Sequence, residues 1–136
     1  MGMARAGFSS MDSLSGIYVL VVDREQERRA LISGILRYCG ALVTPTATSE
    51  SALAIMALFR PDVVIVDVSS PDNGCLTFIR SVRALKPEDG GMVPAIAVAE
   101  GDANAERVHG RGFDAYVRTP LEASELCRVV TSLLTG

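Results

Sequence analysis

Residues 19–29 read VLVVDREQERR, in which four apolar residues lead into Asp23 and an arginine-rich segment follows. An apolar run of this kind, without polar alternation, is typical of a strand buried on both faces of a parallel sheet. A second run, DVVIVD at residues 62–67, ends in Asp67. The two runs therefore predict central strands that each deliver one carboxylate to the same edge of a sheet.

Segments of strand and helix character alternate along the rest of the chain. The predicted strands are residues 17–23, 41–45, 62–67, 94–99 and 115–118. The predicted helices are residues 25–38, one that Thr48 or Ser49 caps and Pro61 ends, one carrying Leu76, Ile79 and Val82, at most a short one within 104–112, and one from Glu122 onward. This alternation predicts a doubly wound α/β fold with a five-stranded parallel sheet in the flavodoxin-like order 2-1-3-4-5.

Length and composition indicate one globular domain. The chain has 136 residues, of which 49% are hydrophobic and 21% charged, with a net charge of −3. These values argue against a disordered chain and against a nucleic-acid-coating one. We expect residues 1–15 to be a disordered arm or a cloning remnant and residues 16–136 to form the domain. With no apolar run near the roughly 20 residues of a membrane span, and no signal peptide, we expect a cytoplasmic protein.

The cysteines and the histidine suggest no further chemistry. Cys39, Cys75 and Cys127 are odd in number and form no CxxC pair, so we expect reduced packing residues and no zinc site. His109 stands alone in a glycine-rich segment and is interpreted as a surface residue. No GxGxxG or GxxxxGK motif follows a strand, which argues against dinucleotide or P-loop binding.

Asp23 and Asp67 end the predicted first and third strands. In the flavodoxin-like order these strands flank the point where the strand order reverses, which is where ligands bind in such sheets. Either aspartate alone could simply cap the helix that follows it. As a matched pair they predict an acidic pocket suited to a metal ion or a phosphoryl group.

Over residues 17–134 the chain resembles the receiver domains of the two-component response regulator family. The resemblance rests on VLVVD, on DVVIVD followed by Pro71 and Gly74, and on AYVRTP before the last helix. It implies that Asp67 is the position that accepts a phosphoryl group from a kinase phosphohistidine, with Mg²⁺ neutralising the phosphoryl oxygens. It also implies a cis bond at Thr119-Pro120 and an aromatic switch position at Tyr116.

The chain departs from the family pattern at three marker positions. Arg24 stands where the family has a second acid that binds magnesium directly. Ala99 replaces a hydroxyl residue, and Thr119 replaces a lysine. Arg118 is next to Thr119 but is a poor substitute, because side chains alternate along a strand. The resemblance thus implies a degenerate phosphorylation site.

Arg24 leads to a hypothesis about the pocket. Asp23, Asp67 and the carbonyl of Ser69 leave only a weak metal site, so we expect no cofactor unless the phosphoacceptor functions with magnesium. Two carboxylates about 4 Å apart repel by about 4 kcal/mol at an effective dielectric near 20. Arg24 could be a built-in counter-ion that offsets this repulsion, or it could turn into solvent. Glu25 could supply the missing acid, although its place at the helix start favours capping.

These patterns favour a non-enzymatic signalling role. We expect a pseudo-receiver that binds a histidine kinase, an effector domain or a copy of itself through the fourth helix, the fifth strand with Tyr116, and the last helix. We expect it to bind neither nucleic acid nor membrane. The alternatives are a functional receiver that a histidine kinase phosphorylates on Asp67, and a small-molecule site in the acidic pocket.

Overall fold

A computed structural model describes residues 13–69 and 74–135 of the chain. Its strands are β1 (Tyr18–Val22), β2 (Leu42–Thr46), β3 (Val63–Asp67), β4 (Ala95–Ala99) and β5 (Ala115–Arg118). Its helices are α2 (Gln26–Tyr38), α3 (Ser49–Leu58), α4 (Gly74–Arg83), α5 (Asp102–Val108) and α6 (Ala123–Thr135), with a 3-10 turn η1 (Pro87–Asp89). Pro71 and Ser70, which belong to the predicted motif after β3, lie outside the described residues.

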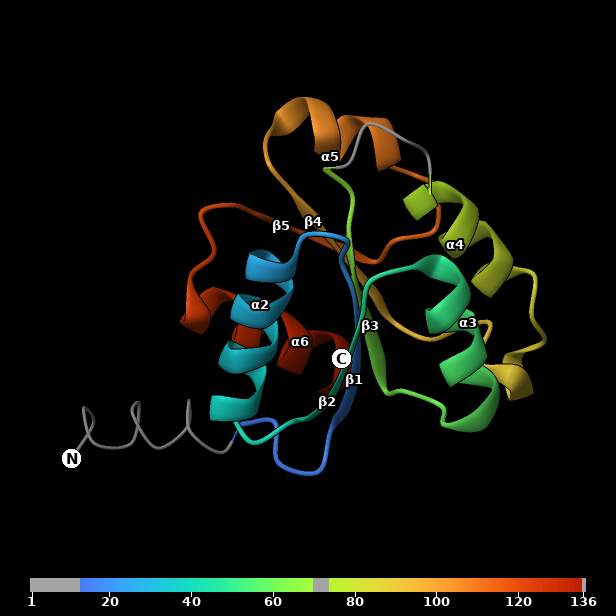
Figure 1. Ribbon diagram of the computed structural model, residues 1–136, viewed down its shortest axis with the longest axis horizontal. Coiled ribbons are helices and arrows are strands. Elements are labelled where there is room, and N and C mark those ends of the chain that lie inside the picture. The colour runs from blue at the N-terminus through green and yellow to red at the C-terminus, as the bar shows by residue number, and fades with distance from the viewer. Residues whose placement is uncertain (1–12, 70–73, 136) are drawn as a thin grey trace.

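The five strands form one parallel sheet in the order β2-β1-β3-β4-β5, which confirms the predicted fold class. Helices α2 and α6 cover one face, and α3, α4 and α5 cover the other (Figure 1). Because helices lie over both faces, β3 and β4 are buried along their whole length. This burial explains why their sequences are apolar without alternation.

Each face of the sheet has its own hydrophobic core. The core under α2 and α6 includes Ile32, Leu36, Leu126 and Val130. The core on the other face is built around α4, where Phe78 is fully buried. The helical spacing of the apolar residues therefore places each helix on the sheet as the sequence predicts.

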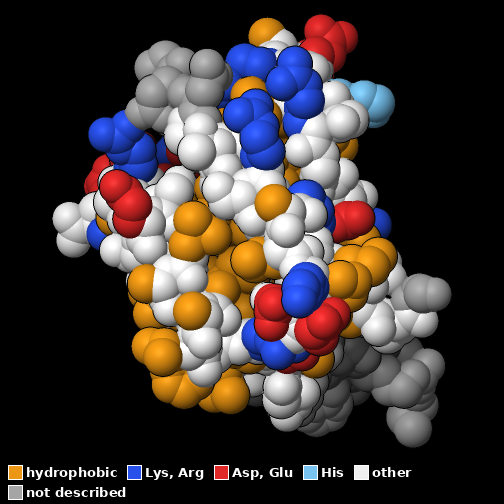
Figure 2. Space-filling view, turned by 90° about the vertical axis from the view of Figure 1, so that its right-hand side faces the viewer, with side chains coloured by type: hydrophobic (Ala, Val, Ile, Leu, Met, Phe, Trp, Pro, Cys, Tyr) orange, Lys and Arg blue, Asp and Glu red, His pale blue; other side chains and the backbone are white. Residues whose placement is uncertain are grey.

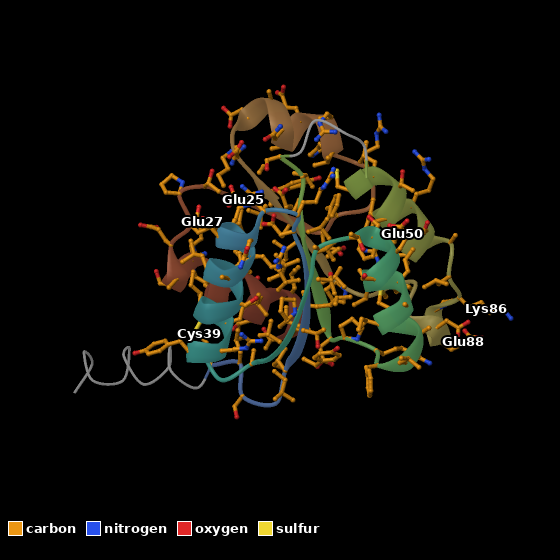
Figure 3. All side chains as sticks on the ribbon, in the orientation of Figure 1. Glu25, Glu27, Cys39, Glu50, Lys86 and Glu88 are labelled. Carbon is orange, nitrogen blue, oxygen red and sulfur yellow. A yellow bond between two sulfur atoms is a disulfide. The ribbon has the colours of Figure 1, made fainter. Side chains whose placement is uncertain are left out.

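Side-chain caps fix the first turns of α2 and α3 at the carboxyl end of the sheet. Glu25 accepts a hydrogen bond from the backbone N–H of Arg28 at 2.9 Å, and Thr48 accepts one from Ser51 at 3.1 Å. Both caps agree with the sequence predictions. Figure 3 shows Glu25 and Glu50 at this same end, where α2 and α3 begin.

Two sequence predictions are wrong. Leu14 belongs to the fold and not to an excluded arm, because it is only 1% exposed and its N–H donates to the carbonyl of Cys39. Cys39 and Cys127 form a disulfide between the end of α2 and α6, where reduced thiols were expected. They are 88 residues apart, so their proximity follows from the packing of α2 against α6 and not from any sequence spacing. Cys75 is a free buried thiol, and burial raises its pKa.

Further features concern the end of the sheet and the helix lengths. The peptide bond Thr119-Pro120 is cis, as the family resemblance implied. Helix α5 spans Asp102–Val108, a short helix that starts slightly earlier than predicted. Within the described residues, no helix combines the length and the apolar character that crossing a membrane requires.

Candidate functional site

The two strand-end acids lie side by side, as predicted. Strands β1 and β3 are parallel neighbours in which Val22 is level with Val66, so the residues that follow, Asp23 and Asp67, meet at one edge. Both are buried, with Asp23 1% and Asp67 7% exposed. Burying two carboxylates together is unfavourable unless hydrogen bonds and a positive charge compensate them.

Arg28 supplies that positive charge and contacts both carboxylates. Its Nε lies 2.7 Å from Asp23 Oδ2, and its Nη2 donates to Asp23 Oδ1 at 3.0 Å. The same Nη2 lies 2.9 Å from Asp67 Oδ2. The Arg28 side chain is itself only 13% exposed. One guanidinium therefore bridges the two acids and makes a two-point contact with Asp23.

The sequence left Arg24 open as a counter-ion or as a solvent-facing residue. The ion pairs seen at the two acids come from Arg28, while Arg24 is exposed and lines the cavities around them. The reason is geometric, because helical side chains point toward the helix N-terminus. Arg28 lies in the first turn of α2, so its side chain reaches back to the edge where the strands end. Arg24 precedes the helix and has no such constraint.

Hydrogen bonds from the following loops orient both carboxylates. The backbone N–H of Glu25 donates to Asp23 Oδ1 at 2.9 Å. The backbone N–H of Ser69 donates to Asp67 Oδ1 at 2.9 Å, and the Ser69 hydroxyl donates to the same oxygen. Both oxygens of Asp23 and Oδ1 of Asp67 therefore accept hydrogen bonds, and Oδ2 of Asp67 is ion-paired with Arg28.

Burial and pairing shift the ionisation of the site in opposing ways. Desolvation raises the pKa of Asp23 above its ordinary value of 3.8, although the hydrogen bonds from Arg28 and Glu25 oppose the rise. Desolvation alone would lower the pKa of Arg28, but its hydrogen bond to Asp23 and the nearby charge of Asp67 outweigh burial and raise it. Arg28 is therefore a permanent cation.

This arrangement does not fit a magnesium ion between the two acids. Mg²⁺ requires oxygen ligands in near-octahedral geometry at about 2.1 Å. Here the carboxylate oxygens that would face the ion already contact Arg28, so a cation could enter only by displacing the guanidinium. Within residues 13–69 and 74–135, no three His, Cys, Asp or Glu residues are grouped closely enough to bind a metal.

Two open cavities border this site. One, of about 430 Å³, lies between the starts of α3 and α4 and is lined by both acids, Arg24 and Cys75, among others. The other, of about 360 Å³, is lined by Asp67, Arg28 and residues of the surrounding loops. Asp67 therefore borders both cavities although Arg28 contacts it.

The other marker positions add no donor near Asp67. Ala99 is fully buried at the end of β4. Thr119 donates its backbone N–H to the carbonyl of Ala99 at 2.9 Å. Arg118 is exposed and pairs with Asp102 at 2.8 Å, which agrees with the prediction that it points elsewhere. None of the three replaces the hydroxyl and the lysine that the family resemblance implied.

Tyr116 is half-buried at the predicted switch position on β5. Its ring stacks on His109 with centroids 5.9 Å apart, and its hydroxyl donates to the carbonyl of Val108 at 3.4 Å. Its side chain thus packs against α5 and the segment that follows. His109, which was interpreted as a surface residue, is exposed.

Sequence reasoning missed Arg28 and Glu100 as members of the site. Arg28 could have been found from its position, because it follows Asp23 by five residues and falls in the first turn of the predicted helix. Glu100 follows β4 and lies 3.8 Å from Arg28 Nη1, and Glu25 lies 3.7 Å from the same atom. These two exposed acids surround the guanidinium on its outer side, while the capping role predicted for Glu25 is confirmed.

Comparisons with known proteins agree with the fold and the motifs. A family model described as the response regulator receiver domain matches residues 19–131. The probable transcriptional regulatory protein TcrX of Mycobacterium tuberculosis is 33% identical over 120 residues. That match covers 87% of this chain, and this chain spans only 50% of the length of TcrX.

Solved structures of receiver proteins are also similar to this chain. A putative response regulator from Chloroflexus aurantiacus superposes with a TM-score of 0.80 at 27% identity, covering 88% of this chain and 98% of the other. The receiver domain of a sensor histidine kinase from Pseudomonas aeruginosa superposes with a TM-score of 0.75 at 26% identity, covering 90% of this chain and 100% of the other. In that structure a magnesium ion is coordinated in the active-site cleft.

Proposed function

Because this chain belongs to the response regulator receiver domain family, whose members are signalling modules, we propose that it is a pseudo-receiver with Arg28 as a fixed counter-ion. In this proposal Asp67 corresponds to the phosphoacceptor, but its site is impaired. The domain acts mainly by binding proteins, and magnesium is not a resident cofactor.

One observation carries the proposal, namely the guanidinium of Arg28 between the two buried carboxylates. Arg28 contacts Asp23 at 2.7 and 3.0 Å and Asp67 at 2.9 Å. Because this cation belongs to a side chain, it cannot leave the site or exchange with ions in solution. Magnesium supplies charge neutralisation in phosphoryl transfer, so a site that excludes it stabilises the transferred group poorly.

The residues at the described marker positions of β4 and β5 support the same conclusion. Ala99 has no side-chain donor, and Arg118 is turned toward Asp102. A phosphoryl group on Asp67 would add negative charge to a site where the guanidinium of Arg28 is already paired with Asp23. The charge would therefore be less well compensated than in a site with both a metal ion and a lysine.

Receiver domains interact with histidine kinases and effector domains, and we place the partner surface of this chain on α5, β5 and α6. Strand β5 is an edge of the sheet, and Tyr116 lies on it half-buried. A partner at this surface would be a histidine kinase, an effector domain or a second copy of the chain. In the proposal this surface keeps one conformation, because the site does not cycle between phosphorylated and free forms.

Intact-mass spectrometry after incubation with acetyl phosphate and Mg²⁺ tests the proposal. We expect the wild-type chain to keep its mass, while a receiver domain with the usual acids, hydroxyl and lysine gains 80 Da under the same conditions. The alternative function, phosphorylation on Asp67 by a histidine kinase, predicts a +80 Da species that disappears in Asp67→Asn. That result would overturn the impaired-site proposal and leave the family assignment intact.

A further inference from the structure

A third cavity, of about 320 Å³, lies between α4 and the segment that joins α5 to β5. Its lining residues are Leu76, Arg80, Arg83, Gly110, Arg111 and Gly112. It shares no lining residue with the two cavities beside the strand-end acids. Figure 2, which looks onto this side of the molecule, shows several Lys and Arg side chains close together near the top, next to the histidine.

Arg83 has a structural role in this cavity. Its Nε and Nη2 donate to the carbonyl of Gly112 at 3.0 and 2.8 Å, and its Nη1 donates to the carbonyls of Gly91 and Val93 at 2.9 and 2.7 Å. Its charge is paired with Asp114 at 3.0 Å. Arg83 therefore ties the loop before β5 to α4 and has little capacity left for a ligand.

The loop is held in a defined conformation on both sides of Arg111. Gly110 and Gly112 have φ angles of +74° and +114°, which residues with a side chain rarely adopt. A Cβ atom at Gly112 would also lie 3.0 Å from Ile79 and 3.3 Å from Arg83. Close packing and the hydrogen bonds from Arg83 thus fix where Arg111 leaves the backbone.

Arg80 and Arg111 face this cavity with unused binding capacity. Both are exposed, and neither side chain makes an ion pair or hydrogen bond with any residue in the described part of the chain. They come from different segments of the chain and line the same cavity, which Leu76 also lines. On a chain whose net charge is −3, this is a local concentration of unpaired positive charge.

We propose that this cavity, the Arg80–Arg111 pocket, binds an acidic peptide segment of a protein partner. Planar guanidinium groups bind carboxylates through two parallel hydrogen bonds, and two of them can hold successive Asp or Glu side chains. The pocket is open and its unpaired charges lie at the surface, which suits a segment laid across it. This inference rests on the proposed role as a protein-binding module and adds the chemistry of one partner.

NMR titration with a hexaglutamate peptide at low salt tests the inference. We expect saturable shifts of the Gly110 and Gly112 amides in the ¹⁵N-labelled wild-type chain. The double variant Arg80→Gln/Arg111→Gln should weaken binding about tenfold or more, because both charge-assisted contacts are lost. Arg60→Gln is the matched control, since it removes an exposed arginine that follows α3, outside the pocket and outside the proposed partner surface, and it should leave the affinity unchanged.

Three results would overturn the inference. The first is equal binding by the double variant and the Arg60→Gln control, and the second is no saturable shift at either glycine. The third is binding of inorganic phosphate to the same amides at lower concentration than hexaglutamate, which would make the pocket a small-anion site. These results are independent of the mass measurement on Asp67, so failure of this inference and failure of the proposed function can be told apart.

Discussion

Replacing Arg28 with glutamine should strongly destabilise the fold and create a response to magnesium. The substitution keeps most of the side-chain length and removes the charge that Asp23 and Asp67 share. Their side chains are 0% and 4% exposed, so water cannot take over the role of the guanidinium. Removing one partner of a buried ion pair costs about 3–5 kcal/mol, and we expect a loss in this range at pH 7.5.

The loss of stability in Arg28→Gln should depend on pH and on the magnesium concentration. Without Arg28, the two carboxylates repel each other and the pKa of at least one rises, so lowering the pH to 5 should recover part of the lost stability. Magnesium can enter once the guanidinium is absent. A site with a Kd near 0.1 mM would recover about 2.7 kcal/mol at about 10 mM Mg²⁺.

Urea denaturation followed by circular dichroism, with and without Mg²⁺, measures both effects. Arg29→Gln is the matched control, because Arg29 is the next residue of α2 and donates to the backbone carbonyl of Asp23 at 2.9 Å. Arg29→Gln should lower the free energy of unfolding by only about 1 kcal/mol, and magnesium should not change its stability. A counter-ion role for Arg28 would be excluded if Arg28→Gln lost no more stability than this control, or if magnesium stabilised the wild-type chain as much as the variant.

Three further experiments test other parts of the structure. The pKa of Asp23 is raised above 3.8, so its contribution to the free energy of unfolding is present below pH 3.8 and is lost as the pH rises toward the folded-state pKa. The stability of wild type relative to Asp23→Asn, measured in urea from pH 3.5 to 7, should therefore fall with pH, and a rise would contradict the assigned direction. Gly91→Ala should lower the melting temperature, because the new Cβ would collide with the Leu85 carbonyl. Gly34→Ala, which places its Cβ in open space on α2, should instead raise the free energy of unfolding by about 0.5–1 kcal/mol. Equal changes in stability for the two variants would contradict the close packing at Gly91. Arg83→Met should lower the free energy of unfolding, measured by calorimetry, by about 3 kcal/mol or more, because the loop before β5 loses its hydrogen bonds to Arg83. A decrease below about 1 kcal/mol would show that these hydrogen bonds contribute little.

The sequence predicts the fold well because its signals are local and repeated. The apolar runs of β1 and β3 have no alternation, and the apolar positions of α4 and α6 recur at helical spacing. The capping residues Glu25 and Thr48 directly precede α2 and α3, so each helix start can be recognised from a few neighbouring residues. Each of these signals depends on neighbours in the chain, so no knowledge of distant contacts was required.

The parts that could not be predicted depend on contacts between distant segments. The Cys39–Cys127 disulfide joins residues that only the packing of α2 and α6 brings together. Leu14 is buried in the hydrophobic core under α2 and α6, and its N–H bonds to the carbonyl of Cys39, neither of which its polar sequence surroundings indicate.

At the candidate site, the sequence predicted the paired acids and the need for a counter-ion. It did not identify the residue, because proximity in sequence favoured Arg24 whereas the direction of side chains on α2 brings in Arg28. The general requirement follows from electrostatics, since two buried carboxylates need a cation. The choice among several nearby arginines requires the three-dimensional position of each.

Crystals grown in 50 mM MnCl₂, with anomalous data collected to locate manganese in place of magnesium, would show whether a metal ion or the guanidinium occupies the space between the two acids. We expect no anomalous peak between Asp23 and Asp67, and a guanidinium of Arg28 within hydrogen-bonding distance of both carboxylates. A hydrated metal ion bound by these acids, with Arg28 turned into solvent, would contradict it.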